Sequence, residues 1–221
     1  LRLLSDVIEV APNRPMHPHK VQRRISRWKA AGLRPFQVAT DPLALIYAGY
    51  EERLRACGVR DRDDLLLDLL ESVRRNADQR QRLATRFTHV LVDEFQEINA
   101  VQYELIRALG GSGRGLFVVG DPRQAIFGSR GGDAGFLQRV AQDYPTAALH
   151  ELQGSYRCSS AIEAAARAVL GATPAVSRHP PLAPSDPALQ LLTTDTDRAE
   201  ASAVASAIAT MSHGITGKGP A

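Results

Sequence analysis

The sequence predicts an α/β fold in which a parallel sheet with flanking helices follows an all-helical segment. Two apolar runs support this prediction, HVLV at 89–92 and GLFVVG at 115–120, and a stretch of helical periodicity follows each of them. Short apolar runs of this kind are typical of parallel strands that are covered on both faces. Because strand–helix–strand units close as right-handed crossovers, we expect the two strands to be parallel neighbours in one sheet.

Residues 1–86 have a helical pattern and few strand signals. Val21, Ile25 and Trp28 recur at helical spacing within KVQRRISRWKAAG. The segment RDDLLLDLLESVRR again places its leucines along one helix face. We therefore expect an all-helical subdomain over 1–86 and an α/β domain over 87–172.

The last part of the chain, 173–221, predicts a connection and the start of another α/β unit. The stretch ATPAVSRHPPLAPSDPA contains five prolines, which exclude regular structure. After it, LQLLTT at 189–194 reads as a strand and DRAEASAVASAIATM at 197–211 as a helix, with Asp195 or Asp197 as its cap.

The composition narrows the classes of protein to consider. Hydrophobic residues make up 44% of the chain. The chain has 27 Lys and Arg and 24 Asp and Glu, and the resulting net charge of +3 is weak evidence for a nucleic-acid partner. Cys57 and Cys158 are far apart in unlike contexts and predict neither a disulfide framework nor a metal site. No run approaches the roughly 20 apolar residues of a membrane span. We expect a cytoplasmic protein with no membrane partner.

Polar residues follow both predicted strands. Asp93 and Glu94 come directly after the first strand, and Asp121 and Gln124 follow the second. The carboxyl ends of parallel strands border the ligand crevice of an open α/β sheet. Adjacent carboxylates there suit nucleotide hydrolysis, in which one holds Mg²⁺ and another accepts a proton from the attacking water. The alternative is structural, because the dipole of a following helix also stabilises acidic residues at its start.

Three segments occur in a fixed order: VDEFQE at 92–97, VGDPRQAIFGSRGGD at 119–133 and LQGSYRCSSAI at 152–162. They resemble motifs two, three and four of the UvrD/Rep-type DNA helicases of superfamily 1. ISRWKAAGLRP and GVRDRDDLLLDLL also resemble segments of that family's inserted helical subdomain.

The resemblance implies an incomplete RecA-like P-loop NTPase lobe. The inserted helical subdomain would occupy 1–86, the part of the first lobe with motifs two to four 87–172, and the start of the second lobe 173–221.

The resemblance also assigns roles in the nucleotide site. Asp93 and Glu94 would form the Mg²⁺ site, with Asp93 holding the ion, and Glu94 would also activate the attacking water. Gln124 would contact the γ-phosphate of ATP and couple it to DNA. Arg157 would meet the γ-phosphate as an arginine finger, and Tyr156 would stack on adenine. A structural ion pair for Arg157 and simple packing for Tyr156 are the alternatives.

The family uses motif three against single-stranded DNA, and Phe127 fits the role of a ring that stacks on a base. Arg130 would either contact the strand or brace the loop through Asp133, and the sequence leaves both open.

The chain departs from the family pattern in several places. Three positions differ in residue type: Glu97 stands where Asp is usual, Ser155 where Asn is usual, and Ser129 where an aromatic is common. The phosphate-cradling loop G-x-x-x-x-G-K-[ST] is absent from the 221 residues, and GGSGRG at 110–115 and TGKGP at 216–220 read as turns. There is no initiating Met, so we expect a segment of a longer protein, and we expect this chain alone to be inactive.

The function that the resemblance implies is that of an ATP-dependent motor that moves 3′ to 5′ on single-stranded DNA and opens duplex junctions, with ATP and Mg²⁺ as cofactors. A non-catalytic module that binds nucleic acid or a partner through a decayed ATPase site is the alternative. The motif with Phe127 and Arg130 disfavours other P-loop ATPases. The sequence leaves open the protein partners and the pathway, whether DNA repair, replication restart or recombination.

Overall fold

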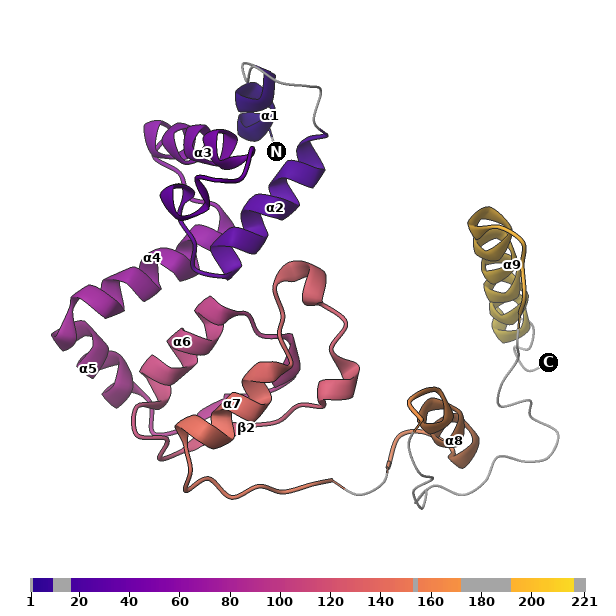
Figure 1. Cartoon of the computed structure of the whole chain (residues 1–221). Helices are drawn as coiled ribbons and strands as arrows, with labels where there is room; N and C mark the ends of the chain where they lie inside the picture. The colour runs from indigo at the N-terminus through magenta and orange to yellow at the C-terminus, as the bar shows by residue number, and fades with distance from the viewer. Residues whose placement is uncertain (1, 10–16, 153–154, 172–191, 217–221) are drawn as a thin grey trace. The chain divides into compact units, whose positions relative to one another are not determined.

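The computed structural model describes residues 2–9, 17–152, 155–171 and 192–216, with side chains described as far as residue 211. The chain divides into two compact units, 1–149 and 150–221. The first unit contains the elements from α1 to α7, and the second contains α8 and α9 (Figure 1).

The first unit begins with a helical segment, as the sequence predicts. Its elements are α1 (Arg2–Glu9), α2 (Pro18–Ala30), the 3-10 turn η1 (Pro35–Val38), α3 (Ala44–Ala56), α4 (Arg62–Arg75) and α5 (Ala77–Arg86). At the start of α4, Asp61 Oδ1 accepts the N–H of Asp64 at 2.9 Å, and Asp64 Oδ2 accepts the N–H of Asp61 at 3.3 Å. These bonds satisfy donors that a helix start otherwise leaves unpaired.

The helical segment has its own apolar core. Val21, Ile25 and Trp28 of α2 are buried there, as their helical spacing predicts, together with Leu4 of α1 and Tyr47 of α3. The rings of Trp28 and Tyr47 stack with centroids 5.7 Å apart. This burial of apolar surface holds the three helices together.

A buried ion cluster, the Lys29 cluster, joins α2, α3 and the start of α4. It consists of Lys29, Glu51, Asp61 and Asp64. The Lys29 side chain is 0% exposed, and its Nζ lies 2.8 Å from Asp61 Oδ2 and 2.7 Å from Asp64 Oδ1, with Glu51 as a further ion-pair partner. Burial alone would lower the pKa of Lys29, but the hydrogen bonds to these carboxylates raise it above the usual value.

The sheet follows the helical segment, and its two strands are parallel, as predicted. Strand β1 (Val90–Val92) pairs with β2 (Leu116–Val118), with Val90 opposite Leu116. The remaining elements of the first unit are η2 (Phe95–Glu97), α6 (Ala100–Gly110), η3 (Pro122–Gln124), η4 (Gly128–Arg130) and α7 (Gly135–Asp143).

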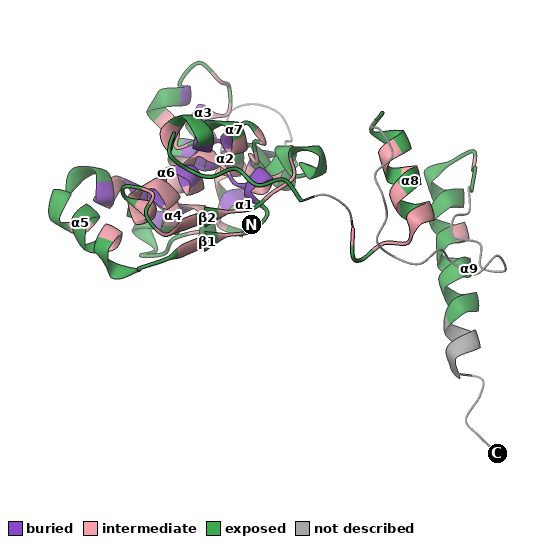
Figure 2. Ribbon diagram, turned by 90° about the horizontal axis from the view of Figure 1, so that it is seen from below, coloured by how far each residue is buried: buried purple, intermediate pink, exposed green. Residues whose placement is uncertain are grey.

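Only one face of this sheet is covered by the described residues. Phe95, Tyr103 and Phe136 form a buried cluster on that face, and α6 and α7 lie above the strands in Figure 2. On the other face, Leu91 and Phe117 are 74% and 59% exposed. The prediction of strands covered on both faces is therefore wrong for the described part of the chain, because its helices pack against one side.

The predicted boundary at 86/87 falls inside the first unit. Leu67 and Leu70 of α4 pack against Val101 and Leu105 of α6 in a buried cluster. The helical segment and the sheet region thus share apolar contacts, so the first unit is continuous across this point.

The second unit contains α8 (Ser160–Val169) and α9 (Asp197–Thr216). The segment of motif four, predicted to belong to the first lobe, lies in this unit. Of the strand predicted at 189–194, the residues 192–194 form no strand and the others lie outside the described residues, as do 172–188. The described residues of this unit therefore contain no strand.

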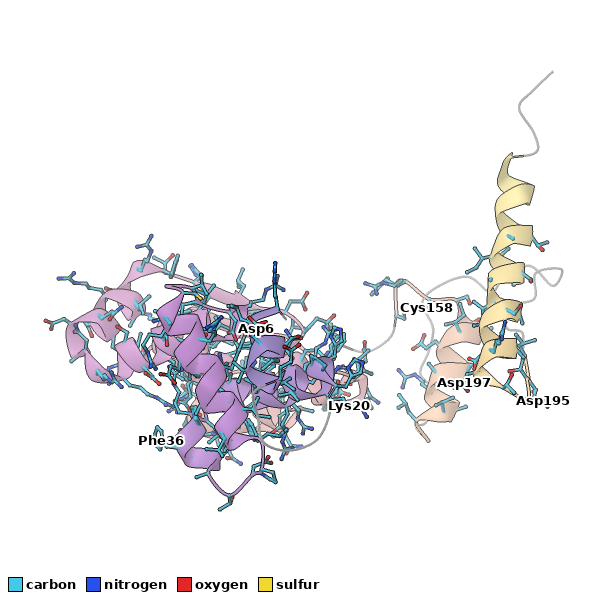
Figure 3. All side chains as sticks on the ribbon, turned by 90° about the horizontal axis from the view of Figure 1, so that it is seen from above. Asp6, Lys20, Phe36, Cys158, Asp195 and Asp197 are labelled. Atoms are coloured by element: carbon cyan, nitrogen blue, oxygen red, sulfur yellow. The ribbon has the colours of Figure 1, made fainter. Side chains whose placement is uncertain are left out.

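Helix α9 begins at the predicted residue, but its cap differs from the prediction. Thr196 Oγ1 accepts the N–H of Ala199 at 3.2 Å. Asp195 and Asp197 flank this cap at the first turn of the helix (Figure 3). The shorter Thr196 side chain makes the capping contact, so the choice between the two aspartates was wrong.

Among the described residues, none of the helices combines the length and the apolar character that crossing a membrane requires.

Candidate nucleotide and DNA site at the strand ends

The residues after β1 form a tight turn. The Asp93 Oδ1 atom accepts the N–H of Glu94 at 2.8 Å. Glu94 has φ 50° and ψ 47°, in the left-handed region, and it is the only non-glycine residue with positive φ in the described part of the chain. Such a conformation costs free energy and tends to be kept where a site needs it.

Both carboxylates of this turn are exposed, and we call Asp93 and Glu94 the strand-end pair. Neither makes an ion pair with a described residue within 4.0 Å, although acidic and basic residues are paired elsewhere in the same unit. Two exposed carboxylates without a neutralising cation at a strand end can bind a metal ion or accept a proton.

The end of β2 supplies a second polar group. Asp121 Oδ2 accepts the Nε2–H of Gln124 at 3.0 Å, and Asp121 Oδ1 accepts both the backbone N–H and the Nε–H of Arg123. Partial burial would raise the pKa of Asp121, but these hydrogen bonds and the Arg123 charge outweigh it and hold the pKa below the usual value. Gln124 is thus placed at the same sheet edge as the strand-end pair.

Backbone bonds bring the two strand ends together. The Val119 N–H donates to the Val92 carbonyl and the Phe95 N–H donates to the Val119 carbonyl, both at 2.9 Å. The side chain of Gln96, 1% exposed, adds a further link: its Nε2–H donates to Glu94 Oε2 at 2.7 Å and its Oε1 accepts the Asp121 N–H at 3.0 Å. The predicted convergence of motifs two and three at one edge is therefore present.

The neighbouring residue, Glu97, holds the loop of motif three. Its carboxylate accepts the N–H of Ile126 at 3.2 Å and the N–H of Phe127 at 3.1 Å. The Phe127 ring is 40% exposed, and the Arg130 guanidinium lies over it, 4.8 Å from the centroid. No ion pair joins Arg130 to Asp133 among the described residues, and Asp133 Oδ1 instead accepts the N–H of Gly135 at 2.8 Å.

A comparison with known proteins shows the family of this chain. The family described as UvrD/REP helicase N-terminal domain matches residues 2–145. The chain belongs to this family.

Curated relatives agree with the assignment. The chain is 36% identical over 159 residues to the ATP-dependent DNA helicase Rep of Escherichia coli (strain K12), covering 69% of the chain and 24% of the relative. It is 34% identical over 178 residues to DNA helicase II of the same organism, covering 77% and 25%. The ATP-dependent DNA helicase PcrA of Staphylococcus aureus (strain Mu50 / ATCC 700699) is 33% identical over 128 residues, covering 58% and 18%. The chain thus spans about a quarter or less of these relatives' length.

The segment that resembles motif four lies in the second unit. Ser155 Oγ accepts the N–H of Arg157 at 3.2 Å and the N–H of Cys158 at 3.1 Å, so this serine organises the turn that contains Tyr156 and Arg157. The side chains of Tyr156 and Arg157 are exposed. Because they belong to the second unit, their approach to the strand-end pair stays a prediction.

The donor set at the family's motif two fits Mg²⁺. No cluster of three or more His, Cys, Asp or Glu ligands is present among the described residues. Magnesium in nucleotide sites commonly takes only one or two protein carboxylates, with waters and substrate phosphates completing the coordination. Asp93 and Glu94 provide such a pair, and both are exposed to solvent.

Two residues of the site were missed by the sequence prediction. Gln96 and Glu97 lie inside motif two, but neither was given a role. Their contacts join residues 25 to 30 positions apart. Periodicity reports only local structure and does not predict such contacts. The one sequence signal was a polar Gln next to the apolar Phe95, and both residues are buried in the structure.

Proposed function

We propose that this chain is the motif-bearing part of an ATP-dependent DNA helicase, with the ends of β1 and β2 as the hydrolysis edge of an incomplete RecA-like lobe. The strand-end pair supports this proposal most directly. Asp93 and Glu94 are exposed and have no cationic partner among the described residues, and Glu94 is linked through Gln96 to the start of the motif three segment. The relatives are named as ATP-dependent DNA helicases, and the proposal extends that activity to the protein represented by this chain.

In the nucleotide site, Asp93 would hold Mg²⁺ with Glu94 beside it. A bound Mg²⁺ neutralises negative charge on the phosphates. The Glu94 carboxylate would accept a proton from the attacking water, and the Gln124 amide, held by Asp121, would contact the γ-phosphate.

The second unit would contribute the remaining contacts to ATP. The Arg157 guanidinium can donate two parallel hydrogen bonds to phosphate oxygens, which suits an arginine finger. The Tyr156 phenol can stack on adenine. Both side chains are exposed and follow the Ser155 turn in motif four.

The DNA-facing part would be the motif three loop. Phe127 is partly exposed and held by Glu97 through its own N–H. Stacking on a base is largely independent of its identity, so this contact suits translocation along single-stranded DNA towards a duplex junction, in the 3′ to 5′ direction implied by the family. Arg130, over the Phe127 ring, would add positive charge next to the phosphate backbone.

We further propose that residues 1–221 alone do not hydrolyse ATP. Their sequence lacks the G-x-x-x-x-G-K-[ST] loop, which cradles the phosphates in P-loop enzymes. The exposed apolar face with Leu91 and Phe117 supports the idea that further protein completes this lobe. A turnover near 1 s⁻¹, at the low end for enzymes, by residues 1–221 would contradict this proposal.

The decisive experiment uses the full-length protein with Glu94→Gln. The amide keeps the shape of the side chain and loses the base, so DNA-stimulated ATP turnover should fall by about 10²- to 10⁴-fold while ATP binding is retained. Glu52→Gln is the matched control, because Glu52 is an exposed carboxylate in the helical segment. Equal turnover of wild type and Glu94→Gln would remove Glu94 from this role. A wild type that binds single-stranded DNA without hydrolysing ATP would instead favour the non-catalytic module.

A cytoplasmic location and a role in DNA repair complete the proposal. Fractionation of cells and the DNA-damage sensitivity of a deletion strain would test them.

A further inference from the structure

Gln96 is the one buried amide at an otherwise exposed edge of the described sheet. Its side chain is 1% exposed, whereas Asp93 and Glu94 on the same turn are exposed. Both heteroatoms of the amide are used: Nε2 donates to Glu94 Oε2 at 2.7 Å, and Oε1 accepts the Asp121 N–H at 3.0 Å. The amide therefore joins the turn after β1 to the end of β2.

The backbone around Gln96 is shaped for this approach. A Cβ atom on Gly120 would lie 2.5 Å from Gln96 Oε1, closer than real Cβ contacts, and 3.0 Å from the Phe95 backbone nitrogen, which is also tight. A glycine at 120 thus makes room for the buried amide beside Asp121. The close fit indicates that the orientation of Gln96 is fixed by its surroundings rather than chosen among rotamers.

We propose that Gln96 is a positioning residue for Glu94. The inference rests on the proposed role of Glu94 as the base in ATP hydrolysis. The Gln96 Nε2–H holds one carboxylate oxygen, Oε2, and no hydrogen bond from a described residue occupies Oε1, which leaves that oxygen for the water. Because Gln96 Oε1 is fixed by the backbone of Asp121, the position of the Glu94 carboxylate follows the end of β2.

A fixed position of the Glu94 carboxylate matters for its proposed role as a base. An exposed Glu side chain samples several rotamers, and most of them would place its carboxylate away from the attacking water. A displacement of about 1 Å at a reacting group can cost about 10²-fold in rate. A buried amide is a suitable holder, since it donates a hydrogen bond to a carboxylate without bringing a competing charge.

The test is Gln96→Met in the full-length protein. Methionine keeps the length of the side chain and loses both hydrogen bonds. Gln102→Met is the matched control, because the Gln102 Oε1 also accepts a backbone N–H, from Asn99 at 2.9 Å, in the cap of α6. Steady-state ATP hydrolysis with single-stranded DNA is measured below the melting temperatures of all three proteins.

We expect kcat to fall by about 10²-fold in Gln96→Met with an unchanged KM for ATP, and neither to change in Gln102→Met. A purely structural role would instead lower the melting temperature and leave kcat of the folded protein intact. A folded Gln96→Met variant with the kcat of the wild type would overturn the role of Gln96 and leave the proposed function unaffected. A wild type without DNA-stimulated hydrolysis would overturn the proposed function, and the role of Gln96 with it.

An activity-independent measurement covers the case in which Gln96→Met does not fold. In residues 1–221, the side-chain NH₂ signals of Gln96 are followed by ¹H–¹⁵N NMR in wild type, Glu94→Ala and the control Glu104→Ala. We expect the Gln96 signals to shift and exchange faster only in Glu94→Ala. Unmoved signals in Glu94→Ala would show that the contact is absent and would overturn the inference.

Discussion

The Lys29 cluster and the strand-end pair both gather carboxylates within the first unit, but in opposite electrostatic surroundings. Around the fully buried Lys29 Nζ, three carboxylates share one cation at hydrogen-bonding distance. After β1, Asp93 and Glu94 are exposed and make no ion pair with a described residue. Each carboxylate of the first group has a cationic partner in the chain, and those of the second group have none among the described residues.

This difference separates structure from function. Charges inside a protein need partners, and the Lys29 cluster supplies them while fixing α2 against α4. Unneutralised carboxylates contribute little to stability and are available to a metal ion, a water or a phosphate-bound ligand. Substitutions in the Lys29 cluster should therefore affect stability, and substitutions near the strand-end pair should affect function.

The largest effect is expected for Lys29→Met. Removing the cation leaves Asp64, which is 1% exposed, with only the Arg34 guanidinium, 3.8 Å away, as a cationic partner, so unfolding free energy should fall by about 3–5 kcal/mol. Urea denaturation of residues 1–221 measures it. The control is Arg75→Met, whose side chain is 80% exposed and should matter by at most about 1 kcal/mol. Equal losses in the two variants would break the comparison.

Acid should remove part of the same stabilisation. Burial raises the pKa of Asp61, but the hydrogen bonds from Lys29 and the Asp64 backbone outweigh it, so the folded-state pKa lies below its usual value. Stability from such a group is present above the unfolded pKa, about 3.9, and is lost as pH falls through the folded value. Unfolding free energy measured below about pH 4 should therefore drop, and it should drop less in Lys29→Met. A parallel pH dependence in both proteins would contradict this.

At the site, Phe127→Ala should cost binding rather than stability. Loss of base stacking should weaken single-strand binding by the full-length protein by about 1–3 kcal/mol, irrespective of sequence. Fluorescence anisotropy at fixed low salt measures the affinity, and thermal melting serves as the control. Ser129→Trp, which restores an aromatic where the family commonly has one, should tighten binding by up to a comparable amount. An unchanged affinity of folded Phe127→Ala would remove the stacking role.

A smaller effect is expected from the difference between Glu94→Gly and Glu94→Ala. Both variants leave the buried Gln96 amide without its carboxylate partner, and both should lose hydrolysis. Only glycine tolerates φ 50° without the cost that a side chain incurs, so the unfolding free energy of Glu94→Gly should exceed that of Glu94→Ala by up to about 1 kcal/mol. The control is the same pair of substitutions at Asp93, which is not among the residues with positive φ, so glycine there should be less stable than alanine by about 0.5–1 kcal/mol. A Glu94→Gly variant less stable than Glu94→Ala would argue against strain at the site.

The smallest effect is expected for Leu91→Ser in residues 1–221. Leu91 is 74% exposed on the uncovered face of the sheet, so unfolding free energy should change by no more than about 0.5 kcal/mol. Leu105→Ala, at a buried position, should cost about 2–5 kcal/mol. In the full-length protein Leu91→Ser should cost more than in this chain. The same small effect in both would mean that no further protein covers this face.

Much of the local architecture was readable from the sequence. Helical periodicity predicted α2 with Val21, Ile25 and Trp28 in the core, and the two apolar runs predicted parallel strands. The order of the motifs predicted the family. These signals are readable because the backbone imposes a fixed repeat on helices and strands. The position of a residue within that repeat therefore predicts the face on which its side chain lies.

The boundaries were less readable. The sequence predicted division at 86/87 and 172/173, and these domain boundaries stay a prediction; in the structure α4 packs on α6 and the two compact units divide at 149/150. Coverage of both sheet faces was also predicted and is not present in the described residues. The unit boundaries and the coverage of the sheet both depend on which elements pack against each other. Apolar patterning predicts that a face is buried, but it does not identify the element that covers it.

The sequence by itself determined where the carboxylates of the strand-end pair lie along the chain and to which family their motif belongs. Only the tertiary structure decided their surroundings. These are the left-handed turn at Glu94, the hydrogen bonds of the Gln96 amide to Glu94 and Asp121, and the hydrogen bond from the Phe127 N–H to Glu97. The physical reason is that the bonds of Gln96 to Asp121 and of Glu97 to Ile126 and Phe127 join residues 25 to 30 positions apart, and their geometry exists only once β1 and β2 pair. Composition fixes the available donors and acceptors, and packing chooses which of them meet.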